Sequence, residues 1–227
     1  NEIESLDALV GRVRQTVPAA DVLIVDDSSP DGTGELADLL AVTDESIHVI
    51  NREKKDGLGR AYLEGFRYGL AHGYHYIVEI DADGSHDPAA LPAMLALAHD
   101  GADLVLGSRW VTGGSVLNWP WARRTISRTG NSYARRILGS KIHDLTAGFR
   151  VFRAEALASL ALESVASQGY CFQIEMAWLI ERSGYVVVEH PITFVERSAG
   201  RSKMHLGIVI EALARVTAWG LFRRRSA

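Results

Sequence analysis

Short apolar runs separated by amphipathic stretches constrain the fold of this 227-residue chain more than any other feature. Four runs have the length and composition of buried strands: residues 22–25, 47–50, 74–80 and 102–106. Between them lie stretches with helical spacing, among them residues 3–13, residues 57–71 and a helix that begins at Asp87-Pro88. This β-α-β-α order predicts an α/β fold with a doubly wound, mostly parallel sheet.

Aspartates follow two of these runs. Asp26 and Asp27 come directly after the first run, and Asp81 and Asp83 flank Ala82 after the third. Open sheets of this type bind their ligands outside the carboxyl ends of the strands. We therefore expect these carboxylates to converge at one rim of the sheet.

The second half of the chain is less regular. Its predicted elements are a Gly/Trp/Pro-rich loop (113–121), a basic helix (123–138), a strand that continues from 186–188 to 191–195, and a last helix (205–222). There is no internal repeat and no low-complexity linker. We assign residues 1–204 to one domain and residues 205–227 to a C-terminal amphipathic helix with a basic tail. The spacing of that helix fits an anchor at a membrane interface, and it also fits a core helix.

Composition excludes several classes of protein. The net charge of -4 and the pI near 6.1 argue against a general nucleic-acid binder. The single cysteine, Cys171, excludes an internal disulfide and fits a reducing compartment. The sequence has no signal pattern and no apolar run of transmembrane length, so we expect no segment to span a bilayer.

One basic stretch departs from this acidic balance. It contains no Asp or Glu and seven basic residues: Arg109, Arg123, Arg124, Arg128, Arg135, Arg136 and Lys141. A solvated helix face would explain this pattern, and so would an anionic ligand. The upstream acidic residues favour the second interpretation, because a site for a metal and a phosphate needs charges of both signs.

Asp81-Ala82-Asp83 is the sharpest local signal. Two carboxylates at a strand end can share a divalent cation with the oxygens of a diphosphate. The alternative is a simple turn, since Asp-x-Asp-Gly also suits turn chemistry. In the second acidic segment, Asp27 can hold a ribose or a base, whereas Asp31 or Thr33 caps the following helix.

Six motifs in order resemble the dolichol- and polyprenol-phosphate mannosyltransferases, which are family-2 glycosyltransferases with the Rossmann-like GT-A fold. These motifs are Asp26-Asp-Ser-Ser-Pro-Asp-Gly-Thr33, Gly57-Leu-Gly-Arg-Ala-Tyr62, Asp81-Ala-Asp83, Gly107-Ser-Arg109, Asp144-Leu-Thr-Ala-Gly-Phe-Arg150 and Glu196-Arg-Ser-Ala-Gly-Arg-Ser-Lys-Met204. The resemblance covers nearly the whole chain. It implies that residues 1–204 form a metal-dependent glycosyltransferase domain that transfers mannose from GDP-mannose to a polyprenyl monophosphate with inversion.

The resemblance also implies a role for individual residues. The residues expected to bind the nucleotide sugar are Glu2, Val25, Asp27, Asp81, Ala82, Asp83, Arg109, Arg197 and Lys203. Asp83 and Ser85 are expected to hold Mg²⁺ or Mn²⁺. Arg109, Arg123 and Arg128 are expected at the acceptor phosphate, with Arg150 a further candidate, because Arg binds phosphate oxygens in a fork. We expect catalysis to depend on Asp83, Arg109 and Arg123.

No strong general base is required, because a phosphate monoester with a second pKa of about 6 is already mostly anionic. His86 and His143 lie in predicted loops, where a solvated or capping histidine is common, and we assign neither a catalytic role.

One departure from the family pattern concerns the start of the chain. Relatives begin with a strand ending Pro-x-Tyr-Asn-Glu, of which only Asn1-Glu2 is present, so the first strand is missing and Glu2 depends on that edge.

The lipid part of the acceptor needs an apolar binding surface. Candidates beside the basic helix are Val111, Val116, Leu117, Trp119 and Trp121, although ordinary loop packing would also explain them. We expect a peripheral protein on the cytoplasmic face of the membrane, with a membrane-protein partner or a fused membrane domain and no nucleic acid. Two alternatives are transfer of glucose or another sugar from a UDP-sugar to the same acceptor, and a receiver-type signalling domain with Asp81 as phosphoacceptor.

Overall fold

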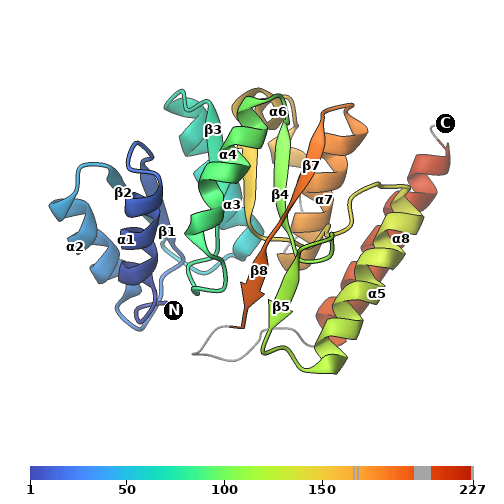
Figure 1. Ribbon diagram of the computed structural model, residues 1–227, viewed down its shortest axis with the longest axis horizontal. Helices are drawn as coiled ribbons and strands as arrows, with labels where there is room; N and C mark the ends of the chain where they lie inside the picture. Colours follow the sequence, from blue (N-terminus) through green and yellow to red (C-terminus); the bar gives the residue numbers. More distant parts are fainter. Residues whose placement is uncertain (166, 168, 197–205, 226–227) are drawn as a thin grey trace.

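A computed structural model describes residues 1–165, 167, 169–196 and 206–225 (Figure 1). The helices are α1 (Leu6–Thr16), α2 (Thr33–Thr43), α3 (Leu58–Ala71), α4 (Leu91–His99), α5 (Trp121–Leu138), α6 (Ala154–Ala158), α7 (Gly169–Arg182) and α8 (Leu206–Arg225). The strands are β1 (Val22–Asp26), β2 (Ile47–Asn51), β3 (Tyr76–Glu79), β4 (Leu104–Ser108), β5 (Ser115–Leu117), β6 (Arg150–Arg153), β7 (Val187–Pro191) and β8 (Thr193–Val195). Two short 3₁₀ helices cover Pro88–Ala90 and Leu162–Ser164.

The strands form three sheets. β1 and β2 make a parallel pair, β5 and β8 make another, and the main sheet has the order β3-β6-β4-β7. In the main sheet β4 and β7 are parallel, whereas β6 runs antiparallel to both of its neighbours. This mixed but mostly parallel arrangement, with helices between the strands, confirms the expected α/β fold.

The four strands predicted in the first half all form, with ends shifted by a few residues. The predicted strand over 186–195 was wrong in one respect, because it is divided at Pro191 between the main sheet and the β5–β8 pair. Proline lacks the N–H that a continuous ladder needs. Strands β5 and β6 and helix α7 were not predicted from the sequence.

A cavity lies between strands β1 and β3. These strands belong to different sheets, and residues of both line this cavity of about 1080 Å³. Among the described residues, the β1–β2 pair is therefore not hydrogen-bonded to any strand of the main sheet. Helix α3 packs on β1 and on β3 and so connects the two parts.

Helix α3 fits closely against its neighbours because its buried face is partly glycine. Gly59, Leu63, Phe66 and Gly69 share that face. A β-carbon at Gly69 would lie 2.8 Å from the Ile77 side chain. Small residues at these positions allow the helix to approach β3.

Helix α8 lies beside α5 along one edge of the molecule and also packs on α7 (Figure 1). Val216 is buried, the Trp219 ring stacks on Trp178 at 6.0 Å, and the hydroxyls of Tyr133 and Thr217 are hydrogen-bonded at 2.6 Å. The division at residue 205 stays a prediction. Within the described part of the chain, no helix is long and apolar enough to cross a membrane.

Candidate active site

The cavity between β1 and β3 collects most of the residues singled out by the sequence. It is lined by Glu2, Val25, Asp27, Asp81, Ala82, Asp83, Ser85, Arg109 and Arg123. The convergence expected at the carboxyl ends of the strands is therefore present. Arg128 does not line the cavity, and the predictions for Arg197 and Lys203 lie outside the described residues.

The first acidic segment is held in place by its own loop and by the end of β2. Asp26 is buried, and its Oδ2 accepts a hydrogen bond from the Ser29 backbone at 2.9 Å. Asp27 forms an ion pair with Arg52, whose Nε also donates to Glu64 at 3.0 Å. This leaves the Asp27 carboxylate in a fixed position at the cavity wall.

The Asp-x-Asp segment is both a turn and part of the cavity. The Asp83 Oδ1 atom accepts a hydrogen bond from the Ser85 backbone at 3.0 Å, and Gly84 has a φ of +73°. The Ala82 carbonyl accepts from the Ser5 hydroxyl at 2.7 Å. Asp81 Oδ1 accepts from the Tyr62 hydroxyl at 2.7 Å. The turn interpretation is therefore compatible with a binding role.

The side-chain oxygens at this turn suit a hard divalent cation. Such a cation would also bind the oxygens of a diphosphate. Among the described residues, no group of three or more His, Cys, Asp or Glu could hold a metal ion. Asp83 supplies a carboxylate, and the buried Ser85 hydroxyl has no hydrogen-bond partner among the residues that the structure describes. Mg²⁺ sites of this class use one or two carboxylates and fill the remaining positions with phosphate oxygens and water. The residues present thus fit such an ion.

His86 differs from the expectation of a solvated or capping histidine, which was wrong. Its side chain is buried, with its ring edge-on to Phe194 at 5.1 Å and tilted on Phe149 at 5.4 Å. Its Nδ1 atom lies 4.0 Å from Asp81 Oδ2. Burial lowers the pKa of His86 below its usual value, so the ring is neutral and supports the turn by packing.

Arg109 is paired with a carboxylate that the sequence analysis did not assign. Its Nε and Nη2 atoms donate to Asp144 at 2.8 and 2.7 Å, and Nη2 also donates to Thr146 at 2.9 Å. Burial alone would raise the pKa of Asp144, but the Arg109 guanidinium holds it below its ordinary value. The ion pair therefore holds the Arg109 guanidinium in the cavity wall, where Asp144 balances its charge.

Aromatic rings surround the two arginines of the cavity. The Arg109 Cζ atom lies 5.5 Å from the centroids of both Trp119 and Phe194, and the Arg123 Cζ atom lies 4.2 Å from Trp119. Such contacts orient a guanidinium without neutralising it. Arg123 also forms an ion pair with Glu196.

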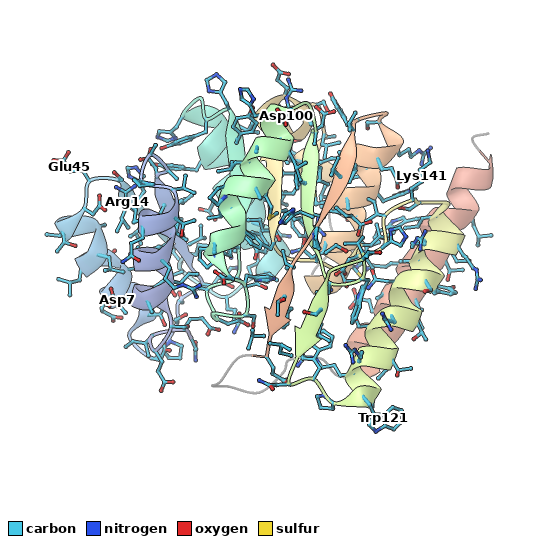
Figure 2. All side chains as sticks on the ribbon, in the orientation of Figure 1. Asp7, Arg14, Glu45, Asp100, Trp121 and Lys141 are labelled. Atoms are coloured by element: carbon cyan, nitrogen blue, oxygen red, sulfur yellow. The ribbon has the colours of Figure 1, made fainter. Side chains whose placement is uncertain are left out.

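The apolar residues expected to form a binding surface for the lipid do not act as one group. Val116 is buried, and Trp119 packs against Phe194, which fits ordinary loop packing. Leu117 is half-exposed, whereas Trp121 is 80% exposed. Figure 2 shows Trp121 projecting into solvent from the first turn of α5.

A second polar cluster lies beneath Asp81. Glu79 and Arg150 are directly opposite each other on β3 and β6, and the Gln173 amide donates to Glu79. Arg150 is fully buried and donates to three backbone carbonyls, those of Leu145, Ala147 and Gln173. The structure therefore gives Arg150 a role in holding backbone segments, not the acceptor role considered from the sequence.

Sequence reasoning missed Tyr62, Asp144 and Glu196 as members of this site. All three lie in motifs that carried the family resemblance, but none received a role. For Asp144 the available signal was the place of Arg109 directly after a predicted buried strand, where a guanidinium needs a hydrogen-bonding partner such as a carboxylate. Tyr62 gave no such signal, because an aromatic residue at helical spacing is most simply explained as core.

Comparison with known proteins identifies the family. Residues 1–160 match the family described as glycosyl transferase family 2. The chain belongs to glycosyltransferase family 2. Membership in family 2 sets aside the receiver-domain alternative and confirms that the chain is a glycosyltransferase.

Two named relatives are similar over nearly the whole chain. An undecaprenyl-phosphate mannosyltransferase of Micrococcus luteus is 53% identical over 224 residues, which cover 99% of this chain and 92% of the relative. A polyprenol monophosphomannose synthase of Mycolicibacterium smegmatis is 51% identical over 222 residues, which cover 97% and 84%.

The fold is shared with a solved structure. Glucosyl-3-phosphoglycerate synthase from Mycobacterium tuberculosis, in complex with Mn²⁺, UDP-glucose and phosphoglyceric acid, aligns with a TM-score of 0.67. The identity is 19%, and the alignment covers 96% of this chain and 76% of that structure. This similarity confirms the GT-A fold expected for family 2.

Proposed function

We propose that the protein transfers mannose from GDP-mannose to a polyprenyl monophosphate, with inversion at the anomeric carbon. The observation that carries the proposal is one cavity lined both by the Asp81-Ala82-Asp83 turn and by Arg109, whose guanidinium is held from behind by Asp144. Two similar proteins named for mannose transfer to polyprenyl phosphates support the choice of sugar and acceptor.

On the donor side, Asp27 and Val25 would contact the ribose and base, with Glu2 at the same wall of the cavity. Asp81 and the Ala82 backbone would hold the rest of the nucleotide. Asp83 and Ser85 would hold Mg²⁺ or Mn²⁺, which when bound neutralises charge on the leaving diphosphate. Solved relatives with bound Mn²⁺ support a divalent ion in this fold.

On the acceptor side, Arg109 and Arg123 would offset repulsion between two anionic reactants. Their guanidinium groups are held by Asp144, by Glu196 and by the Trp119 ring, so they need little reorganisation when the phosphate arrives. The acceptor phosphate is already anionic near neutral pH, so the chain needs to position it and not to deprotonate it. Arg128, Arg197 and Lys203 would add positive charge around the same reactants.

The acceptor requires access to a membrane surface, and we place the protein on the cytoplasmic face. Trp121 and Leu117 are exposed beside the basic helix α5, and indole rings favour the membrane interface. The last helix and its arginines would add to this contact, or would dock on a membrane partner or a fused membrane domain.

The test is a transfer assay with membranes and a panel of labelled GDP- and UDP-sugars. We expect labelled mannose in an extractable lipid from GDP-mannose alone, and loss of transfer by at least about 100-fold in Asp83→Ala. Asp100→Ala, an exposed aspartate after α4, is the matched control. Lipid labelled from a UDP-sugar would favour the glucose alternative, and full chelator-resistant transfer by Asp83→Ala would contradict the metal role.

A further inference from the structure

Tyr62 contacts the Asp-x-Asp turn from below, through a side chain that the reaction as proposed does not use. Its hydroxyl donates to Asp81 Oδ1 at 2.7 Å. Its ring is stacked on Phe172, with centroids 5.9 Å apart and planes 8° apart, and on Phe66 at 6.2 Å. Both phenylalanines are buried core residues, so the hydroxyl is held in a fixed place.

The other oxygen of Asp81 is also confined. A β-carbon built on Gly148 would lie 3.1 Å from Asp81 Oδ2. The backbone at residue 148 therefore lies directly against this carboxylate, in the segment that connects the Arg109 partner Asp144 to β6. Asp81 is thus fixed by a hydrogen bond at one oxygen and by close packing at the other.

The hydroxyl of Tyr62 remains a donor at all working pH values. Desolvation around the phenol raises the pKa of Tyr62 well above its usual value, and the negative charge of Asp81 adds to the effect. A hydrogen bond from a neutral donor to a carboxylate is worth more than one between two neutral groups. The contact therefore suits a role in setting the direction of the Asp81 carboxylate.

We propose that Tyr62 is a positioning residue for the donor nucleotide, acting through Asp81, with the close approach of Gly148 as the second part of the same clamp. The inference rests on the proposed function, in which Asp81 contacts the nucleotide sugar. Tyr62 sets the orientation of Asp81, and through it the affinity for the donor. It has no direct part in the acceptor side of the site.

The test compares Tyr62→Phe with the unmodified protein. Phenylalanine keeps the stacking on Phe172 and removes the hydroxyl. We expect the Kd for GDP-mannose with Mn²⁺, measured by isothermal titration calorimetry, to rise about tenfold. The donor KM should rise in parallel, whereas the acceptor KM and the urea midpoint of unfolding should change little.

Tyr74→Phe is the matched control. Tyr74 donates its hydroxyl to Asp21, so it makes the same type of bond at the opposite ends of these strands. We expect no change in donor affinity for that variant. Gly148→Ala offers a second route to the same effect, because the added methyl would displace the Asp81 carboxylate, and it should weaken donor binding while retaining a folded protein.

Asp81→Asn separates the positioning role of Tyr62 from the proposed contact of Asp81 with the nucleotide sugar. Weaker donor binding in Asp81→Asn together with unchanged binding in Tyr62→Phe would overturn the positioning role and leave the proposed function intact. Unchanged binding in Asp81→Asn would remove the assignment of Asp81 and the positioning role with it. Equal losses in Tyr62→Phe and Tyr74→Phe would show a general structural effect and would also overturn the inference.

Discussion

An unusual residue is Glu79, a buried acid at the end of β3, the edge strand of the main sheet. Its side chain is 2% exposed and lies opposite Arg150 in the β3–β6 register. Burial raises the pKa of Glu79 to about 8, although Arg150 and the Gln173 amide act in the opposite direction. At neutral pH the folded protein therefore carries a proton on this carboxyl that the unfolded chain has released.

This difference makes stability depend on pH. Because the folded pKa exceeds the ordinary value of 4.5, the free energy of unfolding should fall as pH rises from about 5 to 8, with a ceiling of about 1.4 kcal/mol per pH unit for one proton. Glu79→Gln keeps an acceptor for the Gln173 amide but cannot titrate, so it should remove this part of the pH slope. At pH 8 the variant should therefore be more stable than the unmodified protein. Urea unfolding at several pH values measures it.

Glu155→Gln is the control for Glu79→Gln, because it removes one negative charge from a side chain that is 82% exposed. It should leave the slope nearly unchanged. An identical slope in Glu79→Gln and the unmodified protein would contradict the assignment of a retained proton to Glu79.

At the scale of elements, helix α3 determines how closely the two halves of the sheet are connected. A β-carbon at Gly59 would lie 2.7 Å from the Ser167 carbonyl and 3.0 Å from the Phe172 ring. At Gly65, on the same helix, the nearest atom would be 3.7 Å away, on Val25. Close packing therefore disfavours a side chain at position 59, whereas position 65 has room for a methyl group.

Gly59→Ala should lower the free energy of unfolding by about 1–3 kcal/mol, because a carbonyl oxygen cannot move away as a flexible side chain can. Gly65→Ala should be neutral or raise it by up to about 1 kcal/mol through helix propensity. Chemical denaturation of both variants provides a matched comparison. Equal effects at the two positions would contradict the close packing at Gly59.

The sequence predicted the elements whose signals are local. The strands that end at Asp26 and Asp81 are apolar runs of ordinary length, and helix α3 has a regular apolar face. Strand β6 was missed because Arg150 and Arg153 flank only two apolar residues, and its place in the sheet depends on long-range pairing. The partners of Arg109 and Asp81 were missed for the same reason, since a sequence does not specify which distant side chain completes a buried pair.

At the scale of the whole molecule, the candidate donor site lies between two separately hydrogen-bonded sheets. Asp27 follows β1 in one of them, and Asp81 follows β3 in the other. A donor that contacts both carboxylates would join parts of the molecule that share no ladder. Ligand binding should therefore stabilise the whole fold.

GDP-mannose with Mn²⁺ at one hundred times its Kd should raise the free energy of unfolding by about 2.7 kcal/mol. For a chain of this size that corresponds to a rise in Tm of roughly 5–10 °C. Differential scanning calorimetry with and without a chelator measures the shift. Asp83→Ala should abolish it, and a shift that persists in that variant would contradict the metal-dependent mode of binding.

The glycine-lined face of α3 has a mechanical consequence. Because β1 and β3 share no strand hydrogen bonds in the described part of the chain, the width of the opening between the two acidic loops depends on packing against α3 and on cross-contacts such as that of the Ser5 hydroxyl with the Ala82 carbonyl. Packed helices slide by small amounts without breaking backbone bonds. A small shift of α3 would therefore change the spacing between the loops that carry Asp27 and Asp81 while every strand pair stays intact.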